Sequence, residues 1–272
     1  MYKLVLSDLD GTLLNKKKQI SDRTIQTISH LMEKGILFVP ATGRADVMTK
    51  PYRKALKHAD IVISCDGAMV RNGKTDEILY ENTLPADTCR KVFEICKTYG
   101  ISYYVFTKDC LVGDDKKNDR LVIHQKFNQT VAKDEMIPIA FTDDLSSYVI
   151  HHTIYKIVAS YDKKEYLDWA AEKIEQEVKV DATRSGKHVL GIKAEGVSKA
   201  AAMEEMSKVL QIKPEEMIAF GDEVNDIQML QKAGLGIAME NADDIVKEAA
   251  DEVALSNEED GVAVKLEQIF GL

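Results

Sequence analysis

Short apolar runs alternate with amphipathic patterns along the first part of the chain. The run KLVLS predicts a strand at 3–7, and apolar side chains recur at helical spacing through 21–35. Ser21 can cap the start of this helix, and Gly35 can close its end. Further strands are predicted at 36–40 and 60–64. Strand–helix–strand units of this kind predict a parallel sheet with right-handed crossovers.

The pattern changes from about residue 84 to residue 190 and then returns to the first type. Within this stretch we predict helices at 87–100 and 163–178, and strands at 101–109, 153–162, 178–182 and 188–192. From residue 198 onward, a helix at 198–212 and strands at 217–220 and 236–239 follow. The sequence therefore indicates one α/β domain interrupted by an inserted α+β domain.

Composition narrows the class of protein. The 272 residues, 45% of them hydrophobic, can bury the core of one or two domains. The chain has 36 basic and 45 acidic side chains, a net charge of −9 that argues against nucleic acid as a partner. No window approaches the ~18 consecutive apolar residues of a membrane span, so we expect no membrane partner. The pattern does not define an oligomeric state.

The cysteines and the N-terminus bear on localisation. Cys65, Cys89, Cys96 and Cys110 form no C-x-x-C pair and have no zinc-like spacing with histidines, which predicts free thiols in a reducing compartment. Asp8 interrupts the first apolar stretch, which is too short for the core of a signal peptide. We therefore expect a cytoplasmic protein.

Two carboxylates stand at the end of the first strand, in LVLSDLDGTLL at 4–14. Asp8 and Asp10 point the same way because alternate residues of a strand share a face. At about 6 Å and an effective dielectric constant of ~20, two such charges repel by roughly 3 kcal/mol. Water, a proton or a cation must relieve this repulsion, and oxygen ligands beside a phosphate favour Mg²⁺. A solvated turn at Asp10-Gly11 explains the pair equally well.

Two further segments place anion-binding groups where elements begin. In ILFVPATGR, Thr42 and Gly43 lie between a strand and a helix-like segment, where a hydroxyl and backbone N–H groups can cradle an anion. A plain N-cap at Thr42 is the alternative. In EGVSK, Lys199 follows the predicted N-cap Ser198, and its charge opposes the helix dipole unless an anion binds there. An exposed lysine without a role is the alternative.

The segment MIAFGDEVNDIQML repeats the opening theme. An apolar strand ends at Gly221, and Asp222, Asn225 and Asp226 follow it. In an open α/β sheet, the carboxyl ends of neighbouring strands face one crevice, where ligands bind. We therefore predict that four strand ends bring acids, a hydroxyl, a lysine and further acids together at one site.

These segments resemble the four motifs of the haloacid dehalogenase-like phosphatases. DLDGTLL, ATGR, GVSK and GDEVNDIQML occur in the family's order, and the likeness covers the whole chain. It is strongest to the Cof-type branch, subclass IIB. The resemblance implies a Rossmann-like, doubly wound parallel-sheet core at 1–83 and 191–272, with an inserted α/β cap domain at 84–190. It also implies a phosphoric monoester hydrolase.

The resemblance also assigns roles to residues. Asp8 would be the nucleophile that forms an aspartyl-phosphate, and Asp10 the general acid and base. Thr42 and Lys199 would complete the catalytic group. Mg²⁺ would be held by Asp8, the Asp10 backbone carbonyl and Asp222, with Asp226 in support. The phosphate would be held by Leu9 (through its backbone), Thr42, Gly43, Lys199 and Asn225.

The chain departs from the family pattern at three positions. Asp66 stands where asparagine is usual, Gly191 where glutamate is usual, and Ala200 where glycine is common. None of these changes removes a catalytic group, so they affect the choice of substrate more than activity. Our candidates for contacting the non-reacting part of the substrate are Arg44, Asp66, Arg184, Lys187 and His188.

The predicted function is Mg²⁺-dependent hydrolysis of small phosphorylated metabolites, with sugar phosphates as the preferred class. A phosphomutase of the same superfamily is the nearest alternative, because it uses the same groups but returns the phosphoryl group to the sugar. A phospho-accepting signalling switch also combines acids, Mg²⁺, a hydroxyl and a lysine. Such modules are about half this length and lack the insertion. A catalytically silent binding protein is disfavoured because the whole catalytic set is present.

Overall fold

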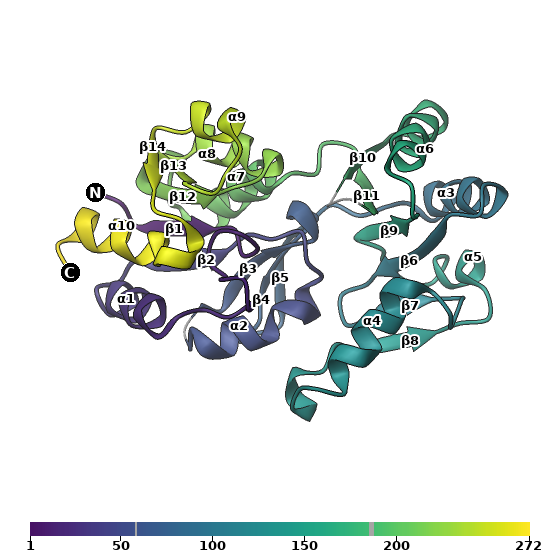
Figure 1. The fold of residues 1–272 in the computed structure, drawn as a ribbon, viewed down its shortest axis with the longest axis horizontal. Coiled ribbons are helices and arrows are strands. Elements are labelled where there is room, and N and C mark those ends of the chain that lie inside the picture. Colours follow the sequence, from purple (N-terminus) through teal and green to yellow (C-terminus); the bar gives the residue numbers. More distant parts are fainter. Residues whose placement is uncertain (58, 185–187) are drawn as a thin grey trace. The chain divides into compact units, whose positions relative to one another are not determined.

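A computed structural model describes residues 1–57, 59–184 and 188–272. Its packing divides the chain into two compact units, whose elements are labelled in Figure 1. The core unit comprises Met1–Thr42, Thr49–Tyr80 and Ser198–Leu272, and the cap unit comprises Gly43–Met48 and Glu81–Val197. The cap unit is larger than the insertion predicted at 84–190. Residues 43–48 and 81–83 pack with it, as does the stretch from 191 to 197.

The core unit is built on a parallel five-stranded sheet in the order β14-β13-β12-β1-β2. At its centre, Leu4 pairs with Met217 on one side and with Leu37 on the other. The strands at the centre of the sheet are continuous apolar runs, as is typical where helices cover both faces. The α/β class predicted for the core is confirmed. The strands are β1 (Leu4–Ser7), β2 (Leu37–Pro40), β12 (Met217–Gly221), β13 (Leu235–Met239) and β14 (Glu252–Ala254).

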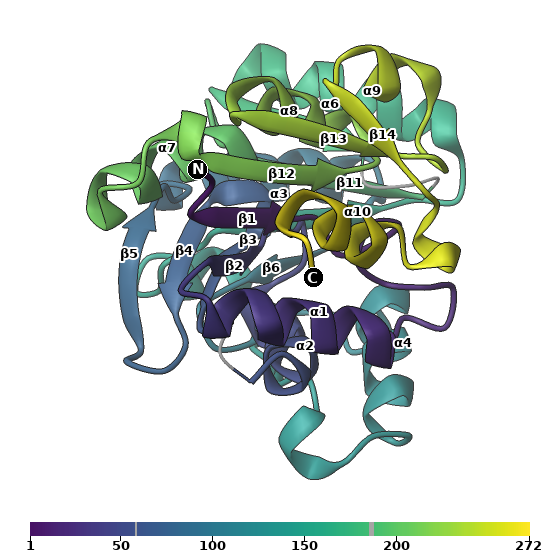
Figure 2. The ribbon, with the colours of Figure 1, turned by 90° about the vertical axis from the view of Figure 1, so that its left-hand side faces the viewer.

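Helices cover the two faces of this sheet. Leu4 and Leu6 pack with Met203 on one face, whereas Val5 packs with Ile28 and Leu266 on the other. Burying each such side chain contributes about 1.5–3 kcal/mol to folding. Figure 2 shows α1 and α10 lying together on one side of the sheet. The helices of the core unit are α1 (Asp22–Glu33), α2 (Lys50–Ala55), α7 (Lys199–Leu210), α8 (Ile227–Lys232), α9 (Asp244–Glu248) and α10 (Gly261–Phe270).

A second, three-stranded sheet in the core unit has the order β3-β4-β5. The strands are β3 (Ile61–Ser64), β4 (Met69–Asn72) and β5 (Glu77–Glu81). The sequence predicted that 60–64 would join the parallel sheet, but β3 pairs antiparallel with β4. The only parallel pairing of β3 among the described residues is an isolated bridge between Ile63 and Ala41, which holds β3 beside the end of β2. The tight connection after β3 turns the chain back on itself and produces the antiparallel pairing.

The cap unit contains a six-stranded sheet in the order β10-β11-β9-β6-β7-β8, together with several helices. Its pairs are antiparallel except β7 with β8. This matches the predicted α+β character of the insertion. Its strands are β6 (Ser102–Phe106), β7 (Leu111–Gly113), β8 (Ile139–Phe141), β9 (Lys156–Ser160), β10 (Val180–Arg184) and β11 (Val189–Ala194). Its helices are α3 (Ala86–Thr98), α4 (Asp119–Asn128), α5 (Leu145–Tyr148) and α6 (Lys164–Glu177).

Short 3₁₀ helices join these elements, at Asp46–Thr49, Cys65–Gly67, Lys133–Glu135, Pro214–Glu216, Val224–Asp226 and Asn257–Glu259. In the described part of the chain, every helix is too short or too polar to span a membrane.

Candidate active site

The carboxyl ends of three neighbouring core strands carry the predicted groups. The ladder between β1 and β12 continues one residue beyond Ser7, because the Asp8 N–H donates to the Phe220 carbonyl at 3.0 Å. On the other side, the Ala41 N–H donates to the Ser7 carbonyl at 2.8 Å. Asp8, Thr42 and Asp222 therefore follow strands that end at the same edge of the sheet, as the parallel topology requires.

Lys199 joins two of the acids in a buried ion cluster. Its Nζ lies 2.5 Å from Asp8 Oδ1 and 2.6 Å from Asp226 Oδ1, and all three side chains are buried. Lys199 opens α7, and the Ser198 hydroxyl caps this helix by accepting from the Ala201 N–H at 3.1 Å. The predicted N-cap is thus present. The lysine does not follow a strand of the core sheet, however, because the strand before it in the chain, β11, belongs to the cap sheet.

The charges of this cluster depend on one another. Burial raises the pKa of Asp8 well above its ordinary value, although the neighbouring Lys199 opposes this effect. Burial also disfavours the charge on Lys199, but Asp226 and Asp8 outweigh it and raise the pKa of Lys199. Lys199 is therefore a cation at neutral pH, and its charge favours the ionised form of Asp8.

Asp226 and Asp222 are held by different donors. Asp226 Oδ2 accepts the backbone N–H groups of Asp222 and Glu223, each at 3.1 Å. Asp222 Oδ1 accepts the Thr12 hydroxyl at 2.6 Å. Burial raises the pKa of Asp222 to about 6, against the lowering effect of this hydrogen bond. Sequence analysis missed Thr12, although its hydroxyl stands in the opening motif, two residues beyond Asp10.

Gly11 makes room for Asp222. Its φ angle of +92° lies in a region that favours glycine, and a Cβ atom at this position would lie 2.1 Å from Asp222 Oδ2. The Asp10-Gly11 dipeptide is therefore the turn that the sequence suggested, and the same turn lets the first and last acidic segments approach each other.

The acids form a set that fits a divalent metal ion. One carboxylate oxygen from each of Asp8, Asp222 and Asp226 lies within 4.8 Å of the other two. The three carboxyl groups can carry three negative charges, and the single ammonium of Lys199 compensates for one of them. An oxygen-only donor set with this charge is suited to a hard divalent cation. The cluster therefore supports a divalent metal at this edge of the sheet.

Thr42 lies at the predicted edge, but its backbone differs from the prediction. Its N–H donates to the Ile63 carbonyl at 2.8 Å, and its carbonyl accepts from the Asp66 N–H at 3.0 Å. The expected helix start is wrong, as is the plain N-cap, because these bonds keep Thr42 in strand-like pairing and a 3₁₀ helix begins only at Asp46. Thr42 itself is buried, at 1% exposure.

The other predicted groups of the core unit are placed as follows. Asp10 lies outside the acid cluster, and its half-exposed carboxylate pairs with Lys18 at 2.6 Å. Leu9 is buried, and its carbonyl accepts from the Leu14 N–H at 2.8 Å. Asn225 donates from Nδ2 to Asp66 Oδ1 at 3.2 Å. The structure thus brings Asp66 against a predicted phosphate ligand, whereas the Asp10 side chain points to the Lys18 loop.

The remaining predicted residues belong to the cap unit or lie outside the described residues. The Gly43 carbonyl accepts from Lys156 Nζ at 3.1 Å, and Arg44 follows it within the same unit. Arg184 pairs with Asp168 on α6 at 3.3 Å. His188 has a buried Nδ1 with no hydrogen-bond partner among the described residues. Lys187 lies outside the described residues.

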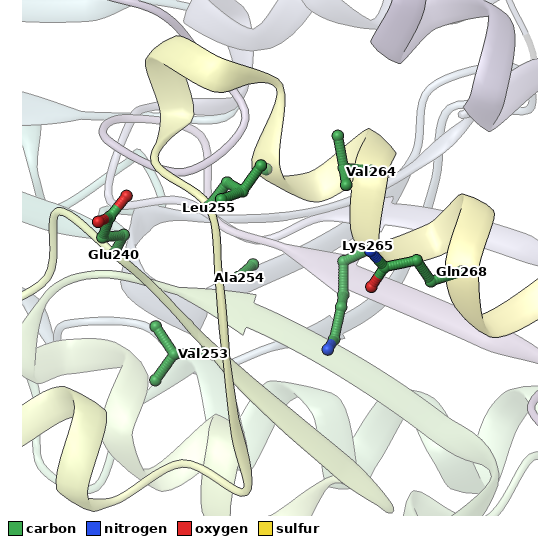
Figure 3. Close-up of a pocket in the computed structure, with 8 residues that line it drawn as sticks. Glu240, Val253, Ala254, Leu255, Val264, Lys265 and Gln268 are labelled. Atoms are coloured by element: carbon green, nitrogen blue, oxygen red, sulfur yellow. The ribbon is translucent and has the colours of Figure 1, made fainter.

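A shallow hollow of about 360 Å³ lies between β14 and α10, lined by Val253, Leu255, Val264 and Lys265 among others (Figure 3). None of the predicted site residues lines it. The hollow is therefore separate from the acid cluster. The cluster is identified by the chemistry of its side chains and not by a cavity.

Comparison with known proteins agrees with this geometry. The model of the haloacid dehalogenase-like hydrolase family matches residues 5–266. The chain is 31% identical to a 5-amino-6-(5-phospho-D-ribitylamino)uracil phosphatase of Bacillus subtilis, over 99% of this chain and 98% of that protein. It is 26% identical to the pyridoxal phosphate phosphatase of Escherichia coli, over 96% of each chain.

A solved structure shares the whole fold. The crystal structure of a haloacid dehalogenase-like hydrolase from Bacteroides thetaiotaomicron matches with a TM-score of 0.88 and 31% identity, over 99% of this chain and 100% of that one. The chain therefore belongs to the haloacid dehalogenase-like hydrolases, and within them it is a phosphatase. The α/β core with an inserted cap that the sequence predicted is confirmed by this likeness.

Proposed function

We propose that this phosphatase hydrolyses sugar phosphates and related small phosphorylated metabolites through an aspartyl-phosphate on Asp8, with Mg²⁺ as its metal. The observation that carries the proposal is the buried cluster in which Lys199 Nζ lies 2.5 Å from Asp8 and the carboxylates of Asp222 and Asp226 lie beside it. A buried nucleophile paired with a cation is suited to attack an anionic substrate, because repulsion between the two anions is reduced.

In the first step, a carboxylate oxygen of Asp8 attacks phosphorus, and the bond between phosphorus and the alcohol oxygen breaks. Asp10 donates a proton to the departing oxygen, so that an alcohol leaves and an acyl phosphate stays on Asp8. The exposed pairing of Asp10 with Lys18 means that this carboxylate must turn inward to act. We propose that Lys199, Thr42, Asn225, Gly43 and the Leu9 backbone hold the phosphate oxygens.

In the second step, water attacks the phosphorus of the acyl phosphate. Asp10 accepts the proton of that water, and the bond between phosphorus and the Asp8 oxygen breaks. Inorganic phosphate leaves, and Asp8 and Asp10 return to their starting states. A single carboxyl group serves both steps because it is protonated for the first and ionised for the second.

Asp8, Asp222 and the Asp10 backbone carbonyl would hold Mg²⁺, with Asp226 nearby as support. The bound ion would neutralise charge on the phosphate and on Asp8. In the structure, Thr12 holds Asp222, and the backbone of the Asp222 loop holds Asp226, which keeps both acids oriented for this task.

The substrate class rests on the predicted cap and on the relatives. The Bacillus subtilis relative acts on a phosphoribityl compound according to its name, and this compound carries a phosphorylated sugar-alcohol chain on a uracil. We therefore place 5-amino-6-(5-phospho-D-ribitylamino)uracil beside hexose and pentose phosphates in the substrate panel. The substrate candidates Arg44, Arg184, Lys187 and His188 remain predictions.

The test is release of inorganic phosphate from this panel with Mg²⁺, with EDTA, and with the variant Asp8→Asn. We expect phosphate release that EDTA abolishes, and a loss of at least about 10³-fold in Asp8→Asn, because the covalent route is then closed. Asp244→Asn, at an exposed position of α9 (Asp244–Glu248), is the matched control and is expected to keep wild-type activity. Full activity of Asp8→Asn contradicts the proposal. Conversion of a sugar phosphate to its isomer without free phosphate identifies a phosphomutase.

A further inference from the structure

The loop after β3 has an unusual backbone. Cys65, Asp66 and Gly67 have φ angles of 53°, 59° and 105°, so three consecutive residues occupy the left-handed region. Two of them carry side chains, which L-residues rarely place there. Both Cys65 and Asp66 are buried. Such a conformation persists only where the surrounding structure fixes it, and it is most frequent at functional sites.

This loop, defined as residues 65–67, touches three of the segments that carry the predicted site. The Asp66 N–H donates to the Thr42 carbonyl at 3.0 Å. A Cβ atom on Gly67 would lie 2.2 Å from the Ser198 carbonyl oxygen, directly before Lys199, so only glycine allows this approach. Asp66 Oδ1 accepts from Asn225 Nδ2 at 3.2 Å. The loop therefore packs against the hydroxyl, lysine and acidic segments at once.

The Asp66 side chain is directed at Asn225. It is only 4% exposed, and its carboxylate can accept hydrogen bonds but not donate them when ionised. The amide of Asn225 must therefore turn its nitrogen toward Asp66. This fixes the direction of the carbonyl oxygen and of the second N–H of the same amide. A hydrogen bond to a charged acceptor also holds the amide more firmly than a neutral one.

We propose that Asp66 is a positioning residue for phosphate binding, whose side chain orients the Asn225 amide while the backbone N–H of the same residue holds the 65–67 loop against Thr42. This inference rests on the proposed function, because it takes Asn225 as a phosphate ligand. The sequence predicted instead that Asp66 contacts the non-reacting part of the substrate. A buried carboxylate bonded to Asn225 acts on the phosphoryl group common to all substrates, and not on their differing parts.

The experiment measures the inhibition constant of inorganic phosphate together with KM and kcat for a generic phosphomonoester. Asp66→Ala is expected to raise the inhibition constant and KM about tenfold, because the amide loses its orientation. Asp66→Asn is expected to restore values close to wild type, because its side-chain oxygen can accept the same hydrogen bond. Asp66→Gly deletes the carboxylate and favours the left-handed backbone, so it covers the case in which Asp66→Ala does not fold.

A double-mutant cycle separates positioning from a general structural effect. In an Asn225→Ala background, Asp66→Gly is expected to cause no further rise in the inhibition constant, because the amide it would orient is gone. Cys65→Ala, a substitution in the same loop away from Asn225, is the control and is expected to leave phosphate inhibition unchanged. Wild-type inhibition in Asp66→Gly, or independent effects of the two substitutions, overturns the inference. Failure of the proposed function is a separate result, since it appears as full activity in Asp8→Asn.

Discussion

One group of buried titratable side chains in the core unit and one in the cap unit respond to burial in opposite ways. In the core unit, Lys199 is buried between Asp8 and Asp226 and forms an ion pair with each of them. In the cap unit, burial lowers the pKa of His124 to about 4 and raises the pKa of Cys89 and Cys96 to about 12, so all three are neutral at physiological pH. The core cluster pairs opposite charges at one point, whereas burial favours the neutral form of these cap groups.

This difference shows where reactive chemistry can reside. A charge survives burial only where partners compensate for the lost hydration, and that compensation takes several groups from separate segments. Among the described residues, the acid cluster that could hold a metal is in the core unit. His124, Cys89 and Cys96 in the cap unit have the neutral protonation states of ordinary core residues. The contrast leads to three predictions, given from the largest expected effect to the smallest.

Removing the cation of the core cluster should have the largest effect. Lys199→Met leaves Asp8 and Asp226 buried without their partner, and we expect the free energy of unfolding to fall by about 3–5 kcal/mol. Urea unfolding followed by circular dichroism measures this loss. The control is Lys208→Met, on the same helix, where the lysine pairs with Glu205 in an exposed position and its loss should not change stability. Equal stability of the two variants would show that the charges of the cluster are not coupled.

The second prediction concerns His124 and pH. Burial is the main cause of its lowered pKa, and the nearby Arg120 and Arg44 add to it. Because the folded pKa of about 4 lies below the ordinary 6.5, the unfolded chain takes up the proton first. The stability linked to this group is therefore fully present above about pH 6.5 and falls as the pH drops toward 4, by up to about 3 kcal/mol.

The fluorescence of Trp169 can follow this effect, since it is the single tryptophan and lies on α6 in the cap unit. We expect the free energy of unfolding, measured with urea, to fall more between pH 7 and pH 4 in the wild type than in the His124→Gln variant. The difference between the two proteins isolates His124 from the carboxyl groups that titrate in both. Parallel pH profiles would show that the imidazole is protonated as readily in the fold as in the unfolded chain.

The third prediction concerns the donor that orients an acid of the core cluster. Thr12→Val removes the hydroxyl that donates to Asp222 at 2.6 Å, and we expect Mg²⁺ to bind about 10- to 100-fold more weakly. Titration calorimetry measures the affinity. Thr27→Val is the matched control, because the buried Thr27 also donates to a carboxylate, that of Glu267 at 2.9 Å, but lies on α1. Similar Mg²⁺ affinities in the two variants would deny Thr12 this role.

Much of the fold could be predicted from local patterns. Apolar runs and helical spacing gave the strands around Leu4 and Met217 and the helix capped by Ser21, because these elements depend on neighbouring residues in the chain. The antiparallel pairing of β3 escaped prediction, since it follows from a left-handed loop that no composition or period reveals. The same applies to the strand-like backbone of Thr42, which is set by its partners on β3 and in the 65–67 loop.

The candidate site divides in the same way. The order of the motifs sufficed to place Asp8, Thr42 and Asp222 together, because a parallel sheet brings the carboxyl ends of its strands to one edge. Lys199 joins them from the start of α7. The tertiary structure alone decided that Thr12 holds Asp222 and that Asp66 holds Asn225. The partners in these pairs are 210 and 159 residues apart in the chain. Short-range patterns carry the propensity of a segment and the chemistry of its side chains, but the orientation of one side chain by another depends on packing between distant segments.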